Sequence, residues 1–464
     1  MKKYFKKTFV LFIALALVFV SFNYAMADST IDDRDYIKVG LYWGSTSKDC
    51  VQLESADGFL LYDSNLNLIE KIDDTSLVID TSSRYLRHKE FVYFMSAAED
   101  IDSRKVVLTT QPGSSSSYSK AYRDGIALYE NSGLRVVNYV TVEHYTWGVV
   151  NREMSSSNPE EALKAQAIAA RTYAYKAKVD KDSGHANYGF DVCTTTDCQV
   201  YGAYSSESDK TTAACIATAH EIMVCENEPI HAYFSAASGG GYTQSLYDAW
   251  GLDDVPYLKS VRDEYTPAHK WHFTDTFAEI GQKVSNYYKI DLGTIQKFEV
   301  TKTNDHGAVT QLTVTGSKGT KVIPRSQIMA VFNLKSTFFV LGNKDYVELT
   351  ESESSDVSSN GTTFKGSVSV LSADGLHTVD TSSLYVYNGK TTTKYETTSG
   401  PAIINNNSEV CTAGTVYWNG LGYGHGIGLS QTGAIAMAKD YGFTYDQILN
   451  YYYSDIDIID YLDL

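Results

Sequence analysis

Three parts of this 464-residue chain combine ionisable or hydroxyl side chains with tight turns, and such combinations can do chemistry. The first is "VVNREMSSSNPEEALKAQAIAARTYAYKAK" at 149–178, in which Glu153 offers a carboxyl group for acid–base work. The second joins "HANYGFDVCTTTDCQVYGAY" (185–204) to "AYFSAASGGGYTQSLYDAWG" (232–251). The third is "WNGLGYGHGIGLSQTGA" at 418–434. Each part alone is also compatible with a purely structural role.

The alternating glycines from Gly420 to Gly428 could imitate a phosphate-binding loop. However, the G-x-x-x-x-G-K-[ST] pattern is absent and no βαβ unit is indicated. The better interpretation is a glycine-lined bend in which the backbone closely approaches a substrate or another strand. His425 lies in that bend and is either a site residue or a structural histidine, and its spacing favours neither.

Other groups of residues give weaker indications of a metal site or a catalytic site. His269 and His272 have a metal-binding spacing, but no third ligand stands near them in the sequence. Gly-x-Ser-x-Gly is absent, and Ser238 in "FSAASGGG" is more typical of a hydrogen-bonded turn than of a nucleophile elbow. Six cysteines are few for this length, so the chain is not a disulfide scaffold. Cys193 and Cys198 are close enough to pair, to bind a metal together, or to do neither.

The element that must position Glu153 is a helix predicted over 158–178. Asn158 is the expected N-cap, Pro159 the first helical residue, and Glu161 the partner in a capping box. A buried stripe is expected at helical spacing along this helix. Its members are Leu163, Ala167, Ala170, Ala174 and Ala177. Glu153 is expected just before the helix, on the connection from the preceding strands.

The rest of the sequence predicts further strands and helices of a mixed α+β fold. The acidic, serine-rich stretch at 348–360 indicates a linker or long loop, with strands beyond it. Strands are expected at 36–43, at 230–236 and within 50–63, where an Asp-Gly turn at 57–58 splits the segment. A helix near 211–223, a hairpin within 295–316 and two short helices within 430–452 are also expected.

The first 27 residues predict export. Four lysines precede an apolar run from Phe9 to Phe22, and "AMA" then provides a small-x-small cleavage site. The run is shorter than the roughly 20 residues of a membrane span, which favours a cleaved signal peptide over an anchor. Without those lysines, 35 Lys and Arg face 56 Asp and Glu, a formal charge of −21. This acidity argues against nucleic acid and anionic lipid as partners.

Several blocks of this sequence resemble those of a known family. "NREM" followed by "PEEALKAQAIAARTYAYK" resembles the signature of the SpoIID/LytB family, the stage II sporulation protein D and LytB amidase enhancer family. "YRDGIAL" (122–128) and "LRVVNYVTVEHYTWGVV" (134–150) precede the signature in the family's order. "LKSTFF" (334–339) follows it, as do the second and third parts quoted above. The resemblance runs from about 36 to 340 and resumes near 410.

The resemblance implies a peptidoglycan lytic transglycosylase, a carbon–oxygen lyase that leaves 1,6-anhydro-N-acetylmuramic acid ends. It assigns the catalytic acid to Glu153. The chemistry agrees, because attack by the sugar's own 6-hydroxyl removes the need for a second carboxylate. One carboxyl group can then protonate the leaving oxygen and afterwards accept the hydroxyl proton. Glu160 and Glu161 are poorer candidates, since both suit the helix start. Asp191 and Asp248 are the candidates if a second carboxylate is needed.

The resemblance also implies an α+β fold around a glycan-binding groove. Arg171, on the helix, is expected either to orient the site or to close a structural ion pair. The expected groove residues are Gln199, Ser238, Tyr242, His425, Ser430 and Gln431. The expected organisation is a signal peptide (1–27), a strand-rich part (28–120), a catalytic core (121–344), a β-rich insertion (345–410) and a C-terminal part of the core (411–464).

The sequence departs from the family's pattern at three places. "EMP" is "EMS" here, with Ser155, and "LEDY" is "VEHY", with His144. The position before "CQ" is often a zinc-binding His in relatives but is Asp197 here. Cys193 with Asp197 or Cys198 could still hold structural zinc, with a disulfide or free thiols as the alternatives. The reaction itself requires no cofactor.

Three functions therefore remain open. The first is the lytic transglycosylase acting on peptidoglycan glycan strands. The second is a non-catalytic wall protein that binds glycan and enhances an N-acetylmuramoyl-L-alanine amidase, and the third is a purely structural wall component. All three place the protein outside the cytoplasm, secreted and wall-associated, with membrane attachment only if the signal segment stays uncleaved. The presence of Glu153 favours the enzyme, since an enhancer has no evident need of a buried acid.

Overall fold

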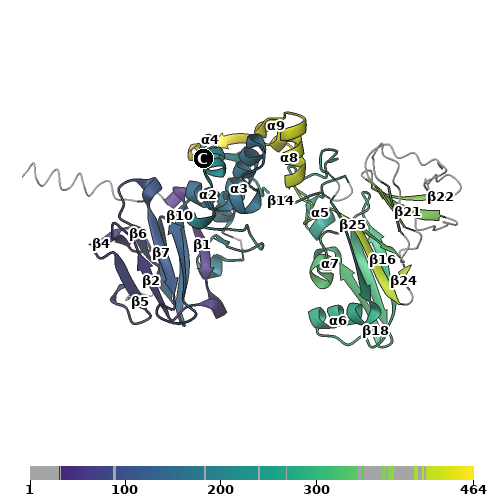
Figure 1. The fold of residues 1–464 in the computed structure, drawn as a ribbon, viewed down its shortest axis with the longest axis horizontal. Helices are drawn as coiled ribbons and strands as arrows, with labels where there is room; N and C mark the ends of the chain where they lie inside the picture. Colours follow the sequence, from purple (N-terminus) through teal and green to yellow (C-terminus); the bar gives the residue numbers. More distant parts are fainter. Residues whose placement is uncertain are drawn as a thin grey trace, which may run out of the picture. The chain divides into compact units, whose positions relative to one another are not determined.

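The protein is described here from a computed structural model. The described residues are 31, 33–86, 90–181, 184–238, 241–267, 269–342, 411 and 414–464, with strand paths at 346–349, 367–372, 375–380, 402–405 and 410. The signal segment expected at 1–27 lies outside them, as does most of the linker expected at 348–360. The chain divides into two compact units (Figure 1). Unit 1 is Met1–Ser156 with Ala174–Ala219, and unit 2 is Ser157–Tyr173 with His220–Leu464.

Two sheets form the body of unit 1, coloured purple to blue in Figure 1. The larger has the order β11 (Val192–Cys193), β1 (Tyr36–Tyr42), β10 (Leu134–Thr141), β9 (Gly125–Glu130), β6 (Val92–Ser96), β3 (Phe59–Tyr62) and β4 (Leu68–Ile72). The smaller has the order β5 (Ser76–Asp80), β2 (Cys50–Glu54), β7 (Lys105–Thr110) and β8 (Tyr118–Arg123). The two strands predicted within 50–63, on either side of an Asp-Gly turn, are confirmed as β2 and β3, which belong to different sheets. Tyrosines pack the larger sheet, with Tyr36 stacked on Tyr139 at a ring-centroid distance of 4.6 Å.

Helix α2 (Val142–Glu153) follows β10 directly, and it corrects the expected position of Glu153. The sequence analysis placed this residue on a strand-to-helix connection, but it is the last residue of α2. The apolar run before it, "YTWGVV" at 145–150, belongs to this helix. Val142, Tyr145 and Val149 are buried at intervals of three and four residues, which is the spacing of one helix face.

The predicted long helix is α3 (Glu160–Asp180), and it starts two residues later than expected. Leu163, Ala167, Ala170 and Ala174 are fully buried, which confirms most of the predicted stripe, while Ala177 is only half-buried. The carboxylate of Glu161 accepts the N–H of Tyr445 over 2.8 Å. The helix expected at 211–223 is shorter: α4 (Asp209–Ala217) ends early, and β12 (Glu221–Cys225) takes its last residues.

Unit 2 combines several small sheets with short helices, and the fold is mixed α+β, as predicted. One core surrounds the fully buried Trp418 and another packs α3 against the C-terminal helices. The hairpin expected within 295–316 and the two helices expected within 430–452 are confirmed. The strand expected at 230–236 is reduced to β14. The paired sets are β13 (Glu228–Pro229), β12 and β27 (Asp457–Asp460); β14 (Phe234–Ser235) and β26 (Leu429–Ser430); and β15 (Lys270–Thr276), β25 (Thr415–Leu421) and β19 (Phe339–Gly342).

Unit 2 holds two further four-stranded sheets, of which the second falls within the segment 345–410. They are β18 (Gly319–Pro324), β17 (Val309–Gly316), β16 (Ile295–Thr303) and β24 (Val410–Cys411); and β20 (Tyr346–Leu349), β23 (Ala402–Asn405), β21 (Ser367–Ser372) and β22 (Gly375–Asp380). Besides the first part of α3, the described helices of unit 2 are α5 (Leu246–Trp250), α6 (Phe277–Tyr288), α7 (Arg325–Phe332), α8 (Gln431–Asp440) and α9 (Tyr445–Tyr452).

Candidate functional site

Glu153 is half-buried at the C-terminal end of α2, and a loop of unit 1 reaches its carboxyl group. The backbone N–H of Val200 donates to its Oε1 over 2.8 Å. This hydrogen bond favours the ionised carboxylate. The helix end acts in the other direction, because the last carbonyl groups of a helix carry partial negative charge. Because Glu153 ends α2, its carboxyl group adjoins the negative end of a helix.

Close packing between α2 and the loop holds Val200 in place. Gly148 lies where a Cβ atom would come within 2.5 Å of the Tyr201 ring. Its carbonyl oxygen accepts the N–H of Gly202 over 2.9 Å and the hydroxyl of Ser206 over 3.0 Å. Glu153 lies five positions after Gly148 on the same helix. The absence of a side chain at 148 therefore helps to set where Val200 meets the acid.

Gln199, one of the predicted groove residues, lies in this loop beside Val200. Its side chain is 1% exposed, and its Oε1 accepts the hydroxyl of Tyr145 over 2.9 Å. Its Nε2 has no hydrogen-bond partner in the part of the chain that the structure describes. A buried amide without a partner is costly, so this group has a donor to offer to a ligand or to water.

A cleft of about 540 Å³ opens next to this end of α2, entirely within unit 1. Val200 and Arg152 both line it, although Glu153 itself does not. The other walls come from β1, β8 and the loop that follows β11. They comprise Leu41, Tyr42, Tyr118, Lys120, Tyr122, Thr194, Tyr201, Gly202, Ser205 and Ser206. Sequence reasoning missed these strand residues, because nothing in their local pattern separates them from ordinary sheet positions.

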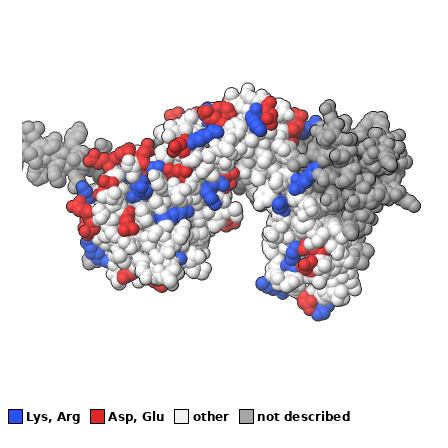
Figure 2. All heavy atoms as spheres, in the orientation of Figure 1, with Lys and Arg blue, Asp and Glu red and all other residues white. Residues whose placement is uncertain are grey.

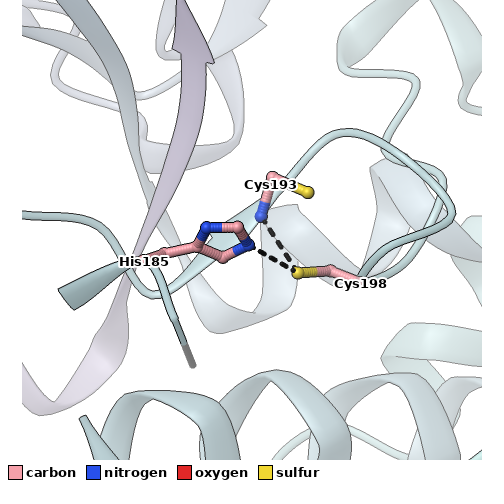
Figure 3. Close-up of side chains that lie close together, drawn as sticks. All are labelled: His185, Cys193 and Cys198. Carbon is pink, nitrogen blue, oxygen red and sulfur yellow. Dashed lines mark hydrogen bonds between the residues drawn. The ribbon is translucent and has the colours of Figure 1, made fainter. Parts of the chain in front are cut away.

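Near the same loop, the predicted metal-binding residues meet one that sequence reasoning missed. His185, Cys193 and Cys198 bring a ring nitrogen and two sulfur atoms within 4.8 Å of one another (Figure 3). Nε2 of His185 lies 3.3 Å from Sγ of Cys198, which also accepts the N–H of Cys193 over 3.3 Å. Asp197, which the sequence analysis included, lies outside this group, because its side chain is exposed on the loop.

The chemistry of these three groups fits zinc. A hydrogen bond from Cys198, helped by Thr195 and by the charge of His185, lowers the pKa of Cys193 to about 5 despite burial. A thiolate is the form of cysteine that ligates metals, and Zn²⁺ takes sulfur and imidazole ligands. Three protein ligands leave one tetrahedral position for another group. All six cysteines are described, and none of them forms a disulfide.

The predicted serines of unit 2 belong to a buried polar network. Ser238 donates to Oδ2 of Asp263 over 2.8 Å, and the hydroxyl of Ser430 lies 2.6 Å from that of Thr266. Ser430 also accepts the N–H of Ser238 over 3.2 Å, while Tyr452 donates to Oδ1 of Asp263 over 3.1 Å. These contacts give both serines a structural part, joining β26 to the loop after β14. A contact between them and glycan stays a prediction.

His425 lies in a glycine-lined bend, which has the close backbone approaches that the sequence suggested. Gly424 and Gly428 have φ angles of +104° and +67°, a region that side chains disfavour. A Cβ on Gly428 would meet the Tyr233 carbonyl oxygen at 2.1 Å. Nδ1 of His425 accepts the N–H of Ile427 over 3.0 Å. Burial lowers the pKa of His425 to about 4, so the ring is neutral near pH 7.

The other predicted residues take varied positions. Tyr242 stacks on His306 at 4.0 Å, and Gln431 donates to the fully buried Gln166 over 3.2 Å. Arg171 is itself fully buried and donates to the Glu221 carbonyl oxygen over 3.1 Å, which supports its structural alternative.

The two candidates for a second carboxylate differ in their surroundings. Asp191 accepts the Lys38 N–H over 2.8 Å, and burial raises its pKa. Asp248 lies in the first turn of α5, in unit 2, whereas Glu153 and Gln199 belong to unit 1.

Figure 2 shows Lys and Arg scattered among Asp and Glu over the described residues of the face drawn. Within the described part of the chain, no helix has the length and apolar character needed to cross a membrane.

Comparison with known proteins matches residues 130–225 to the family described as stage II sporulation protein, SpoIID. A second match, to a domain of unknown function (DUF8618), covers residues 263–364. The first match contains α2 with Glu153, Gln199, and the group formed by His185, Cys193 and Cys198. The second begins in unit 2 and runs into the segment after residue 344.

Three relatives are similar over long stretches. The chain is 29% identical to stage II sporulation protein D of Bacillus subtilis over 383 residues, which cover 79% of this chain and 89% of that protein. It is 34% identical to stage II sporulation protein D of Bacillus amyloliquefaciens over 173 residues, 34% of this chain and 49% of that protein. It is 29% identical to the amidase enhancer of Bacillus subtilis over 326 residues, 68% of this chain but 40% of the enhancer.

Proposed function

Because this chain belongs to the SpoIID/LytB family and thus has a role in the cell wall or in sporulation, we propose that it is a peptidoglycan lytic transglycosylase with Glu153 as its acid. Its substrate is the β-1,4 bond between N-acetylmuramic acid and N-acetylglucosamine. The observation that carries the proposal is the placement of Glu153. A half-buried carboxyl group closes α2, receives one backbone N–H, and adjoins a cleft.

The reaction needs only one carboxyl group. Protonated Glu153 gives its proton to the glycosidic oxygen as the bond from that oxygen to C1 breaks. The 6-hydroxyl of the same muramic acid then forms a bond to C1, and the Glu153 carboxylate accepts the hydroxyl proton. No water is consumed, and the acid returns to its starting state. The helix end favours the protonated group that begins the cycle, and the Val200 N–H favours the carboxylate formed halfway.

Gln199 supports this role through its buried, unpartnered Nε2, which we assign to binding of a sugar oxygen near the acid. We assign structural zinc to His185, Cys193 and Cys198, where the ion would fasten the loop that carries Gln199 and Val200. The zinc takes no part in the bond cleavage.

A second candidate function has support from the amidase-enhancer relative. In that case the protein binds glycan and stimulates a cell-wall amidase without cutting the strand. The position of Glu153 favours the enzyme, because glycan binding alone does not require a half-buried carboxyl group at a helix end.

The test is product analysis by mass spectrometry. The purified protein is incubated with intact peptidoglycan and, separately, with glycan strands stripped of peptides. We expect new 1,6-anhydro ends from the wild type and a loss of about 10²–10⁴-fold in Glu153→Gln. Glu160→Gln is the matched control, since its side chain is 65% exposed at the start of α3.

Two results would count against the proposal. Unchanged activity in Glu153→Gln would overturn the assignment of the acid. If the wild type makes no anhydro ends on either substrate but binds glycan and stimulates an amidase, the enhancer function holds instead.

A further inference from the structure

The cleft beside Glu153 has an unusual combination of walls for so acidic a protein. Tyr42, Tyr118 and Tyr122 line it from β1 and β8, and two cations, Lys120 and Arg152, line it as well. Its volume of about 540 Å³ falls within the roughly 300–1,000 Å³ of small-ligand sites. Aromatic rings beside polar groups are a common way to bind sugars, because the ring faces cover the apolar side of the sugar.

The two cations have no acidic partners among the residues that the structure describes. Neither Lys120 nor Arg152 forms an ion pair with any described residue, and yet Lys120 is half-buried. Burial lowers the pKa of Lys120, and the positive charge of Arg152 lowers it further. A third cation, Lys48, lies 4.2 Å from the centre of the Tyr42 ring. The half-buried charge of Lys120 is unfavourable until an anion enters the cleft, and the exposed Arg152 adds a second positive charge beside it.

We propose that this cleft binds a carboxylate-bearing part of peptidoglycan, with Lys120 and Arg152 contacting the carboxylate and the tyrosine rings contacting the sugar. The inference rests on the proposed function for the identity of the polymer and adds the residues that recognise its charge. Because Arg152 directly precedes Glu153, and Val200 contacts both the cleft and the acid, a strand held here would pass close to the acid.

Peptidoglycan has two sources of such a carboxylate. One is the lactyl group of a muramic acid that has lost its peptide, and the other is the stem peptide itself. Phosphate-bearing polymers are also negatively charged, but they have no carboxylate that esterification can mask. A binding experiment can separate the two carboxylate sources, the lactyl group and the stem peptide.

The experiment measures binding of glycan strands by isothermal titration calorimetry in the full chain carrying Glu153→Gln, which leaves the strands uncut. Three ligands are compared at about 0.15 M salt: peptide-free strands, the same strands with their carboxylates methyl-esterified, and strands with stem peptides. The cation variants are Lys120→Met and Arg152→Met. Lys120→Arg keeps the charge, and Lys71→Met removes an exposed lysine of unit 1 that does not line the cleft.

We expect each cation variant to weaken binding about tenfold, the size of one charge-assisted hydrogen bond. Lys120→Arg and Lys71→Met should bind as the parent does. If esterification weakens the parent as much as Lys120→Met does, the lactyl carboxylate is the ligand. If Lys120→Met and Arg152→Met weaken the binding of strands with stem peptides but not of peptide-free strands, the peptide carboxylate is the ligand.

Unchanged binding of all strands by folded Lys120→Met and Arg152→Met would overturn the inference, as would an equal loss in Lys71→Met. Folding is checked by the near-ultraviolet circular dichroism of each variant. Failure of the proposed function gives a different pattern. In that case binding still depends on the cations, while the wild type forms no 1,6-anhydro ends.

Discussion

The N–H of Val200 points to Oε1 of Glu153 over 2.8 Å, and this contact depends on how the Val200 loop rests on α2. Tyr201, the next residue, packs where Gly148 has no side chain. Helix α2 therefore carries Glu153 at its end and, five positions earlier, Gly148, against which the loop that contacts Glu153 packs. A substitution at Gly148 should therefore shift the Val200 loop and change the surroundings of Glu153 without contacting Glu153 itself.

Gly148→Ala should lower both stability and activity. Alanine normally stabilises a helix relative to glycine by up to about 1 kcal/mol. Here the new Cβ would meet the Tyr201 ring at 2.5 Å, and overpacking of this kind costs roughly 1–3 kcal/mol. We expect a lower melting temperature and fewer 1,6-anhydro ends.

The matched control is Gly281→Ala on α6, where the nearest atom is 3.1 Å away, in the side chain of Ile295. This variant should cost less stability and leave the activity unchanged. If Gly148→Ala proves more stable than the wild type and fully active, the loop does not rest on α2 as described.

His144 should make the stability of unit 1 depend on pH. Burial alone would lower its pKa, but the hydrogen bonds and charge of Asp124, with a contribution from Asp102, raise it overall. Nδ1 lies 2.9 Å from Asp124 and Nε2 lies 3.2 Å from Asp102. The folded state therefore holds the proton more tightly than the unfolded chain, whose pKa is about 6.5. The stabilisation is fully present below that value and is lost as pH rises through the raised pKa.

We expect the wild type to melt higher than His144→Gln by more at pH 5.5 than at pH 8.5, with a difference of about a few degrees. Asp102→Asn tests the same idea from the partner's side, because its side chain is 63% exposed and its loss should not unfold the protein. A gap between wild type and variant that is constant over pH would contradict the assignment.

His425 should have the opposite pH dependence. Burial lowers its pKa to about 4, so the folded state resists protonation. As pH falls from about 6.5 towards 4, the unfolded chain takes up a proton that the folded chain does not, and the stability contribution falls. His425→Asn, which keeps an acceptor for the Ile427 N–H, should lose less melting temperature between pH 7 and pH 5 than the wild type does.

Metal analysis should find about one zinc per chain in protein purified without chelator. Cys198→Ser and His185→Ala should each lose the metal, because either change leaves only two of the three ligands. Cys225→Ser, which alters a cysteine outside the group, should retain it, and Asp197→Asn should retain it too. Zinc retained in His185→Ala but lost in Asp197→Asn would restore the ligand set inferred from sequence.

Sequence reasoning reached the α+β fold, the helix at 158–178 and the glycine bend, because periodic burial and turn chemistry are local signals. It placed Glu153 on a strand-to-helix connection, because no separate helix was predicted between the strands and the helix at 158–178, whereas Glu153 ends α2. It missed His185, since a ligand eight residues before Cys193 has no recognisable spacing until the loop folds. Tyr118, Lys120 and Tyr122 alternate along β8, but Tyr42 belongs to β1 of the other sheet, so only the folded unit brings the two strands together at the cleft.

The boundary between the two units falls inside α3, between Tyr173 and Ala174. The chain therefore builds most of unit 1, starts unit 2, returns to unit 1 along the same helix, and then completes unit 2. Neither unit can be produced from one uninterrupted stretch of sequence. During synthesis, unit 1 is complete only after residues up to 219 have been made, which include α4 and the loop that carries Cys193 and Cys198. Truncations that aim to isolate the acid-bearing half would have to cut a helix that both halves share.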